Sequence, residues 1–182
     1  MHLEDNIEFA VNPETRCPVV LLLDTSGSMS GERIDQLNLG VTTFKQEVEQ
    51  DPTASLRVEV AVITFDNSAQ VVQDFVTINQ FIPPVLQAIG RTSTGQGIEL
   101  ALDTIEKRKS VYKNNGVQYY RPWLFLITDG SPTDSWQQAA QRAKQAVADG
   151  KLSFFAVGVQ GADMATLGQI ASPGFRLLCW ID

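Results

Sequence analysis

Three short runs of mostly apolar residues constrain most strongly what this chain can fold into. They occupy positions 19–23 (VVLLL), 123–127 (WLFLI) and 152–159 (LSFFAVGV). Each run is as short as a strand and lacks the polar alternation of a half-exposed one, as expected of strands that are covered on both faces. The sequence therefore predicts a sheet whose central strands lie between two layers of helices.

Helical patterns separate these runs. Between positions 33 and 50, apolar residues recur every three or four positions, which predicts an amphipathic helix. Further helices are predicted over 97–113 and 163–170, and over 135–149, where Asp134 and Gln137 form a capping box at the start. A shorter helix is expected around 79–89. The stripe of the first helix consists of Ile34, Leu37, Val41, Phe44 and Val48.

The remaining strands complete the predicted sheet. An alternating strand begins at Leu56, and a tight Asp-Asn-Ser turn leads to a neighbouring strand at 69–76, which predicts an antiparallel edge. FRLLCW, at 175–180, is predicted to be a last strand. Alternating strands and helices predict a doubly wound α/β fold with a mostly parallel sheet, one antiparallel edge strand and helices on both faces. We expect residues 17–182 to form one domain, preceded by an N-terminal arm at 1–16.

Composition excludes several classes of function. The chain has 14 basic and 21 acidic residues, a net charge of −7, which argues against a nucleic-acid-binding protein. No apolar run reaches the roughly 18 residues of a membrane span, and the start resembles no secretory signal. We therefore expect a cytoplasmic monomer. Cys17 and Cys179 match no zinc-ligand spacing, and both reduced thiols and a disulfide remain open.

Two of the buried strands end on a carboxylate, Asp24 and Asp129. The carboxyl ends of parallel strands meet at one edge, where doubly wound sheets bind ligands, and Ser26, Ser28 and Thr92 are predicted to lie at the same edge. Two carboxylates and three hydroxyls favour a hard cation, Mg²⁺ or Mn²⁺, with Ca²⁺ possible, over zinc or copper. Neutral hydroxyls leave such an ion incompletely neutralised, so we expect it to keep water or an open position that attracts a carboxylate from outside.

Other interpretations of the same residues are weaker. Asp24 could serve a magnesium-dependent hydrolase or phosphotransferase as a nucleophile, but Ser26 occupies the position of the usual second acid. A serine hydrolase needs a base, and the only histidine is His2. GRTSTGQG lacks the lysine of a phosphate-binding loop. Either aspartate alone could be a turn former or a helix cap.

Three segments carry a resemblance to a known family. DTSGS after the first strand, GRTST in the middle and LITDG later resemble the three loops of von Willebrand factor A-type domains, over about residues 18–171. The resemblance implies a non-enzymatic protein-interaction module with a metal-ion-dependent adhesion site (MIDAS). It also implies that Ser26, Ser28 and Thr92 hold the ion directly, that Asp24 and Asp129 act through bridging waters, and that a partner's Glu or Asp completes the shell. Thr94 would instead cap the next helix.

RCPVVLLLDTSGSM and DGSPTDSW further resemble the stand-alone bacterial YegL/TerY-like members, which implies a role in a stress or tellurite-resistance system. Two features depart from the family pattern. Family members normally continue past the last strand into a C-terminal helix; after FRLLCWID this helix is expected to be either truncated or lacking in this member. Arg91 also stands where the family commonly has glycine or another small residue, and a solvated side chain is its simplest interpretation.

Overall fold

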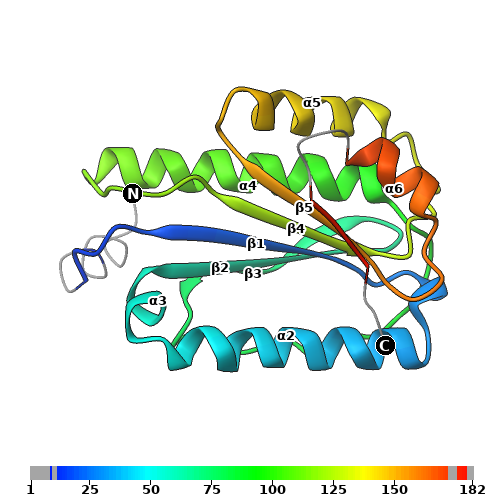
Figure 1. Cartoon of the computed structure of the whole chain (residues 1–182), viewed down its shortest axis with the longest axis horizontal. Helices are drawn as coiled ribbons and strands as arrows, with labels where there is room; N and C mark the ends of the chain where they lie inside the picture. Colours follow the sequence, from blue (N-terminus) through cyan, green and yellow to red (C-terminus); the bar gives the residue numbers. More distant parts are fainter. Residues whose placement is uncertain (1–8, 10–11, 172–175, 180–182) are drawn as a thin grey trace.

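The computed structural model describes residues 9, 12–171 and 176–179, the last four as backbone only. Its strands form one sheet in the order β3-β2-β1-β4-β5-β6 (Figure 1). All neighbouring strands pair in parallel except β2 and β3, which are antiparallel. This arrangement confirms the predicted sheet. The strands are β1 (Cys17–Asp24), β2 (Val58–Phe65), β3 (Ala69–Thr77), β4 (Trp123–Thr128), β5 (Ser153–Gly158) and β6 (Arg176–Cys179).

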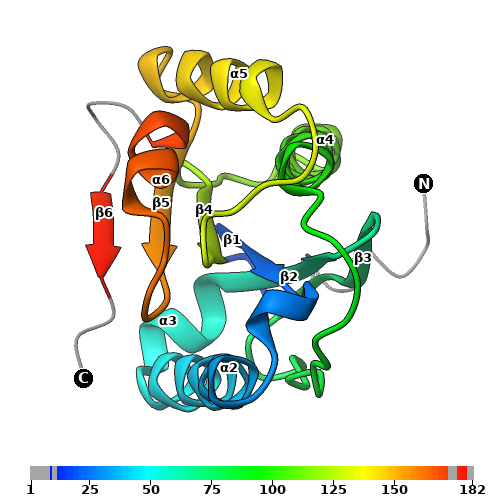
Figure 2. The same cartoon turned by 90° about the vertical axis from the view of Figure 1, so that its right-hand side faces the viewer.

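Helices cover both faces of this sheet, as Figure 2 shows. On one face lie α4 (Thr94–Asn114), α5 (Gln137–Ala148) and α6 (Met164–Ile170), and on the other α2 (Glu32–Gln50) and α3 (Pro52–Arg57). A 3₁₀ turn, η1 (Gly27–Met29), connects β1 to α2. Among the described residues, no helix is both long and apolar enough to span a membrane.

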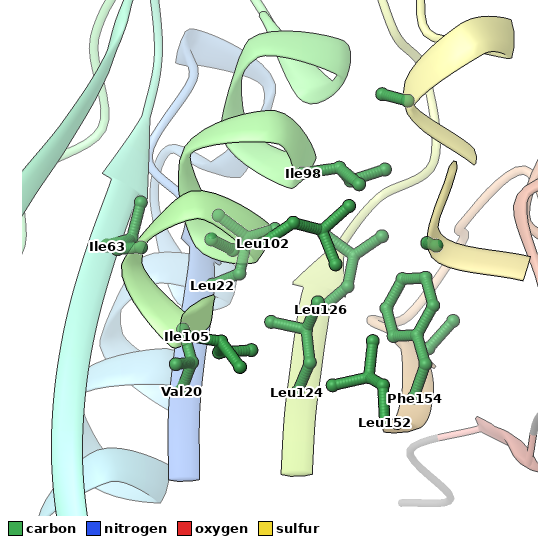
Figure 3. Close-up of a cluster of buried hydrophobic side chains, with 14 of the residues drawn as sticks. Val20, Leu22, Ile63, Ile98, Leu102, Ile105, Leu124, Leu126, Leu152 and Phe154 are labelled. Atoms are coloured by element: carbon green, nitrogen blue, oxygen red, sulfur yellow. The ribbon is translucent and has the colours of Figure 1, made fainter. Parts of the chain in front are cut away.

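The continuous apolar run of β1 serves two separate cores. Leu22 belongs to the cluster beneath α4 and α5, whereas Leu21 and Leu23 belong to the cluster beneath α2. Figure 3 shows the first cluster, in which Leu22 lies among side chains of β4 and α4 such as Leu126 and Leu102. Because successive side chains of a strand point to opposite faces, a doubly covered strand must be apolar at every position.

The predicted short helix around 79–89 is wrong. Residues 81–89 form a segment without regular secondary structure, which contacts α2 through Asn38. Pro83 and Pro84 lack the amide hydrogens that a helix needs, and each disfavours helical geometry in the residue before it. Asn38 of α2 instead pairs with the backbone of Leu86, donating to its carbonyl at 3.0 Å and accepting from its amide at 2.8 Å.

Three predicted element starts also need correction. The strand expected from Leu56 begins at Val58, because Pro52–Arg57 forms α3 and the Asp51 carboxylate caps it. α4 begins at Thr94 rather than at residue 97. The capping box at Asp134 is absent: α5 begins at Gln137 without a side-chain cap, and Asp134 accepts hydrogen bonds from the amides of Gly95 and Gln96, both at 3.0 Å.

A buried charged cluster closes the opposite end of the sheet from the ends of β1 and β4. Glu59 accepts from the Arg108 guanidinium at 2.8 Å and pairs with Arg16 at 2.9 Å. The Tyr112 hydroxyl also donates to Glu59, and Phe9 packs against the ring of Tyr112. Burial, and then the nearby Glu59 charge, raise the pKa of Tyr112. These contacts tie Phe9 and Arg16 to β2 and α4.

The backbone also bears on the two cysteines. Cys17 begins β1 and Cys179 ends β6, and β4 and β5 lie between those strands. Three strand spacings of about 4.8 Å separate β1 from β6 by roughly 14 Å, beyond the Cα separation that a disulfide can bridge. Within the described residues Cys17 is a free thiol, so the fold disfavours the disulfide interpretation.

Candidate metal centre

The candidate site lies where β1 and β4 end side by side. Asp24 is the last residue of β1, and Asp129 directly follows β4, whose Ile127 is paired with Leu23. Both side chains are buried: Asp24 is fully inaccessible and Asp129 is 5 % exposed. The parallel register therefore brings two carboxylates to one edge of the sheet, as the sequence predicted.

Both oxygens of Asp24 have hydrogen-bond donors. Oδ1 accepts from the Ser26 amide at 2.9 Å, and Oδ2 accepts from the Thr128 hydroxyl at 2.5 Å. Burial raises the pKa of Asp24 above the usual range, hydrogen bonds from Ser26 and Thr128 lower it, and the charge of Asp129 raises it again. The net rise in pKa means that an ionised Asp24 is electrostatically costly here, and a nearby cation would remove that cost.

Ser26 and Ser28 lie in the turn after β1 with their hydroxyls 3.0 Å apart. Ser26 is buried, whereas Ser28 is exposed. Met29, at the end of η1, is fully buried and anchors the turn in the core below α2. The D-x-S-x-S spacing thus places two neutral oxygen donors beside Asp24, on a turn that packing holds in place.

Thr92 lies in a neighbouring loop that is hydrogen-bonded to the same turn. The Gly27 amide donates to the Gly90 carbonyl at 3.0 Å, and the Ile89 amide donates to the Thr25 carbonyl at 2.8 Å. A Cβ on Gly27 would lie 3.2 Å from that Gly90 oxygen, so the glycine permits a close approach. Thr92 itself is buried.

Thr133 fixes the backbone on both sides of Thr92. Its hydroxyl accepts from the Thr92 amide at 3.1 Å, and its own amide donates to the Thr92 carbonyl at 2.8 Å. Thr94 does not cap α4 as predicted, because the N-cap is Ser93 and makes no side-chain cap bond. The Thr94 hydroxyl is instead fully buried and has no hydrogen-bond partner among the described residues.

Asp129 is held from three directions. Its Oδ1 accepts from the Ser131 amide at 3.3 Å, and its carbonyl accepts from the Asp163 amide at 2.7 Å. Its Oδ2 lies 3.6 Å from Nη1 of Arg33, in the first turn of α2. One oxygen of Asp129 therefore already faces a positive charge supplied by the chain itself.

Four residues that organise this site could not be recognised as such from the sequence. They are Arg33, Thr128, Thr133 and Asp134, the last of which was predicted only as a cap of the helix over 135–149. Thr128 belonged to a strand whose register could not be known, and Arg33 had the pattern of a solvated helix residue. Thr133 and Asp134 act on Thr92 and on the start of α4 across about 40 residues of sequence. The only available signal was general: buried backbone amides need hydrogen-bond acceptors, and Thr133 and Asp134 can supply them.

The donor set fits a hard divalent cation. The described residues contain no group of three or more His, Cys, Asp or Glu side chains that could hold a metal. Two buried carboxylates with facing serine hydroxyls are oxygen-only ligands, which suit Mg²⁺, Mn²⁺ or Ca²⁺. The raised pKa of Asp24 also fits a cation site, because a nearby positive charge would favour the ionised carboxylate.

Comparisons with known proteins agree with this fold. The chain is 26 % identical over 166 residues to matrilin-1 of Gallus gallus, covering 85 % of this chain and 31 % of that protein. The chain thus spans about a third of the length of this relative. Its fold is similar to BatB of Bacteroides thetaiotaomicron, with a TM-score of 0.63 and 17 % identity over 91 % of this chain and 90 % of the other.

A further similar structure is proximal thread matrix protein 1 from the mussel byssus, described with a zinc-occupied MIDAS motif. It aligns with a TM-score of 0.59 and 21 % identity, over 93 % of this chain and 42 % of the other. The family model for the von Willebrand factor type A domain matches residues 19–177. The chain belongs to the von Willebrand factor type A domain family.

Proposed function

We propose that this domain binds one divalent cation at the ends of β1 and β4 and uses it to dock a partner protein through a Glu or Asp side chain. The observation that carries the proposal is the contact between Asp24, Ser26 and Ser28, with Asp129 close enough to raise the pKa of Asp24. Ser26, Ser28 and Thr92 would hold the ion, and the two aspartates would orient its water.

A bound cation would supply positive charge and one open coordination position. The chain's own part is to fix the donors: Thr128 holds Asp24 from one side, and the Ser26 amide holds it from the other. Mg²⁺ or Mn²⁺ is the ion that this oxygen-only set supports best. Zinc, the ion in the mussel structure, prefers nitrogen and sulfur ligands, which the described site lacks.

An exposed apolar segment beside the site supports docking rather than catalysis. Val85 and Ile82 are the two most exposed large hydrophobic side chains of the described residues, at 87 % and 78 %, and Ile89 is 62 % exposed. Asn38 hydrogen-bonds to the backbone of this segment at Leu86, and the Ile89 amide donates to the Thr25 carbonyl in the turn that carries Ser26. Exposed apolar groups on a fixed backbone mark interaction surfaces, and we assign this one to the segment of the partner that carries the acidic residue.

The alternative, a magnesium-dependent hydrolase or phosphotransferase, would need Asp24 as a nucleophile. Both of its oxygens already accept hydrogen bonds, and it is fully buried. A buried carboxylate fixed in this way orients other groups better than it attacks a substrate. The resemblance to stand-alone bacterial members leads us to propose a cytoplasmic stress-response setting.

The test is the capture of partner proteins by the immobilised domain, once with millimolar Mg²⁺ and once with EDTA. The Ser26→Ala/Ser28→Ala variant is tested in parallel. We expect a captured protein that needs both the metal and the two serines, and that is released when one of its own acidic residues is changed to the amide. Equal capture in EDTA would contradict docking through a metal. Metal-dependent phosphatase or esterase turnover that Asp24→Ala abolishes would favour the enzyme instead.

A further inference from the structure

Arg33 is the only positively charged side chain within salt-bridge distance of either site carboxylate among the described residues. Its Nη1 lies 3.6 Å from Oδ2 of Asp129 and donates a 2.9 Å hydrogen bond to the carbonyl of Ser28. The guanidinium therefore spans two loops of the candidate metal centre. Its side chain is 35 % exposed, so water screens part of its charge.

The position of Arg33 is unusual for a cation. It is the second residue of α2, where the helix dipole favours negative charge, and the same turn contains Glu32 and Asp35. Its Nη2 lies next to Gly161, where an added Cβ would come within 2.9 Å of it, so the glycine leaves room for the guanidinium. Arg33 is thus positioned by the loops around the site rather than by its own helix.

We propose that Arg33 is a built-in cation that competes with the divalent metal for Asp129 and so sets the metal affinity of the site. The inference rests on the proposed metal-dependent function. Without metal, Asp24 and Asp129 together carry two negative charges when ionised, and Arg33 offsets one of them. When a divalent ion enters, Arg33 becomes a like charge close to it, which weakens the binding of the ion.

This assignment differs from a purely structural role. If Arg33 served only to fix the turn through the Ser28 carbonyl, its removal would loosen Ser28 and weaken metal binding. If its charge competes with the ion, removal strengthens metal binding. The two roles predict opposite signs for the change in affinity, so one titration separates them.

The experiment is calorimetric titration of Mg²⁺ and Mn²⁺ into the wild-type chain and into Arg33→Gln, Arg33→Lys and Arg57→Gln. Arg57 pairs with Glu14 at the opposite end of the sheet and has a similar exposure, 36 %, so it controls for net charge. We expect Arg33→Gln to bind both ions about 3- to 10-fold tighter, because a partly screened like charge is removed. Arg33→Lys and Arg57→Gln should stay within about 2-fold of the wild type, because the first keeps the charge and the second is remote.

Salt and thermal unfolding give further readouts. The difference between wild type and Arg33→Gln should shrink when NaCl is raised from about 20 mM to 500 mM, because salt screens exposed charges. The rise in melting temperature caused by metal should be larger in Arg33→Gln. If the wild type binds metal and Arg33→Gln binds it equally or more weakly, the proposed role of Arg33 is overturned, whereas the metal site stands. Absence of metal binding in every variant would overturn the metal site itself.

Discussion

The hydroxyl of Thr128 donates a 2.5 Å hydrogen bond to Oδ2 of Asp24, across the boundary between β4 and β1. The Thr128 oxygen also accepts from the Gly130 amide at 3.0 Å, so one side chain connects Asp24, at the end of β1, with the loop that carries Asp129. Because this bond lowers the pKa of Asp24 against the effect of burial, it keeps the carboxylate available to a cation.

Replacing Thr128 by Val should therefore weaken both the fold and the site. We expect a loss of about 1–3 kcal/mol in the free energy of unfolding, since a buried carboxylate loses a donor. Metal affinity should fall about 10-fold, and Thr128→Ser, which keeps the hydroxyl, should recover most of it. Urea unfolding and calorimetric titration measure the two effects, and wild-type affinity in Thr128→Val would disprove the positioning role of this bond.

The two buried threonines at the start of α4 should behave differently. Thr92 is a proposed direct ligand, so Thr92→Val should lower metal affinity at least about 10-fold while the fold is retained. Thr94→Val removes a hydroxyl that has no partner among the described residues, and should leave the metal-free stability unchanged or slightly higher. Titration and thermal unfolding of both variants give the answer, and a larger loss of affinity in Thr94→Val would reverse the assignment of the ligand.

Metal binding should depend on pH through Asp24. Its pKa in the folded, metal-free chain is raised, so its ionisation destabilises the fold as the pH rises through that pKa, and protonation relieves this cost. A cation needs the ionised form, so metal affinity should decline on acidification, beginning above the usual aspartate range near pH 4. Titrations in buffers of different ionisation enthalpy should show proton release in that window. Affinity that stays constant down to about pH 4 would contradict the raised pKa.

The charged cluster at the other end of the sheet should govern stability without affecting the metal. Glu59→Gln removes the carboxylate that faces buried Arg16, and should cost about 3–5 kcal/mol in the free energy of unfolding. Tyr112→Phe removes one buried hydrogen bond to the Glu59 carboxylate and should cost about 1.5–3 kcal/mol. Urea unfolding measures both variants. Metal affinity should match the wild type, and a loss of affinity in Glu59→Gln would show that the two ends are coupled.

The sheet and the site carboxylates could be predicted because strong local patterns determine them. The apolar run of β1 indicates a strand that is covered on both faces, and the residue that ends it must lie where the carboxyl ends of the parallel strands meet. Pro83 and Pro84 already disfavoured the helix predicted around 79–89, but the docking of this segment on α2 could not be predicted, because its backbone partner is the Asn38 side chain, 48 residues away from Leu86. The roles of Thr128 and Asp134 at the site could not be predicted either, because their hydrogen-bond partners depend on strand register and on loop packing.

The central claim is most directly tested by calorimetric titration of Mn²⁺ into the wild type, into Ser26→Ala/Ser28→Ala and into Ser30→Ala. Ser30 lies in the same turn, but its hydroxyl is already donated to the Gly27 carbonyl at 2.7 Å. The account predicts one Mn²⁺ site in the wild type and in Ser30→Ala, with affinities within about 2-fold, and at least about a 10-fold loss in the double variant. Equal Mn²⁺ binding by the double variant and the wild type would contradict a metal centre at Ser26 and Ser28.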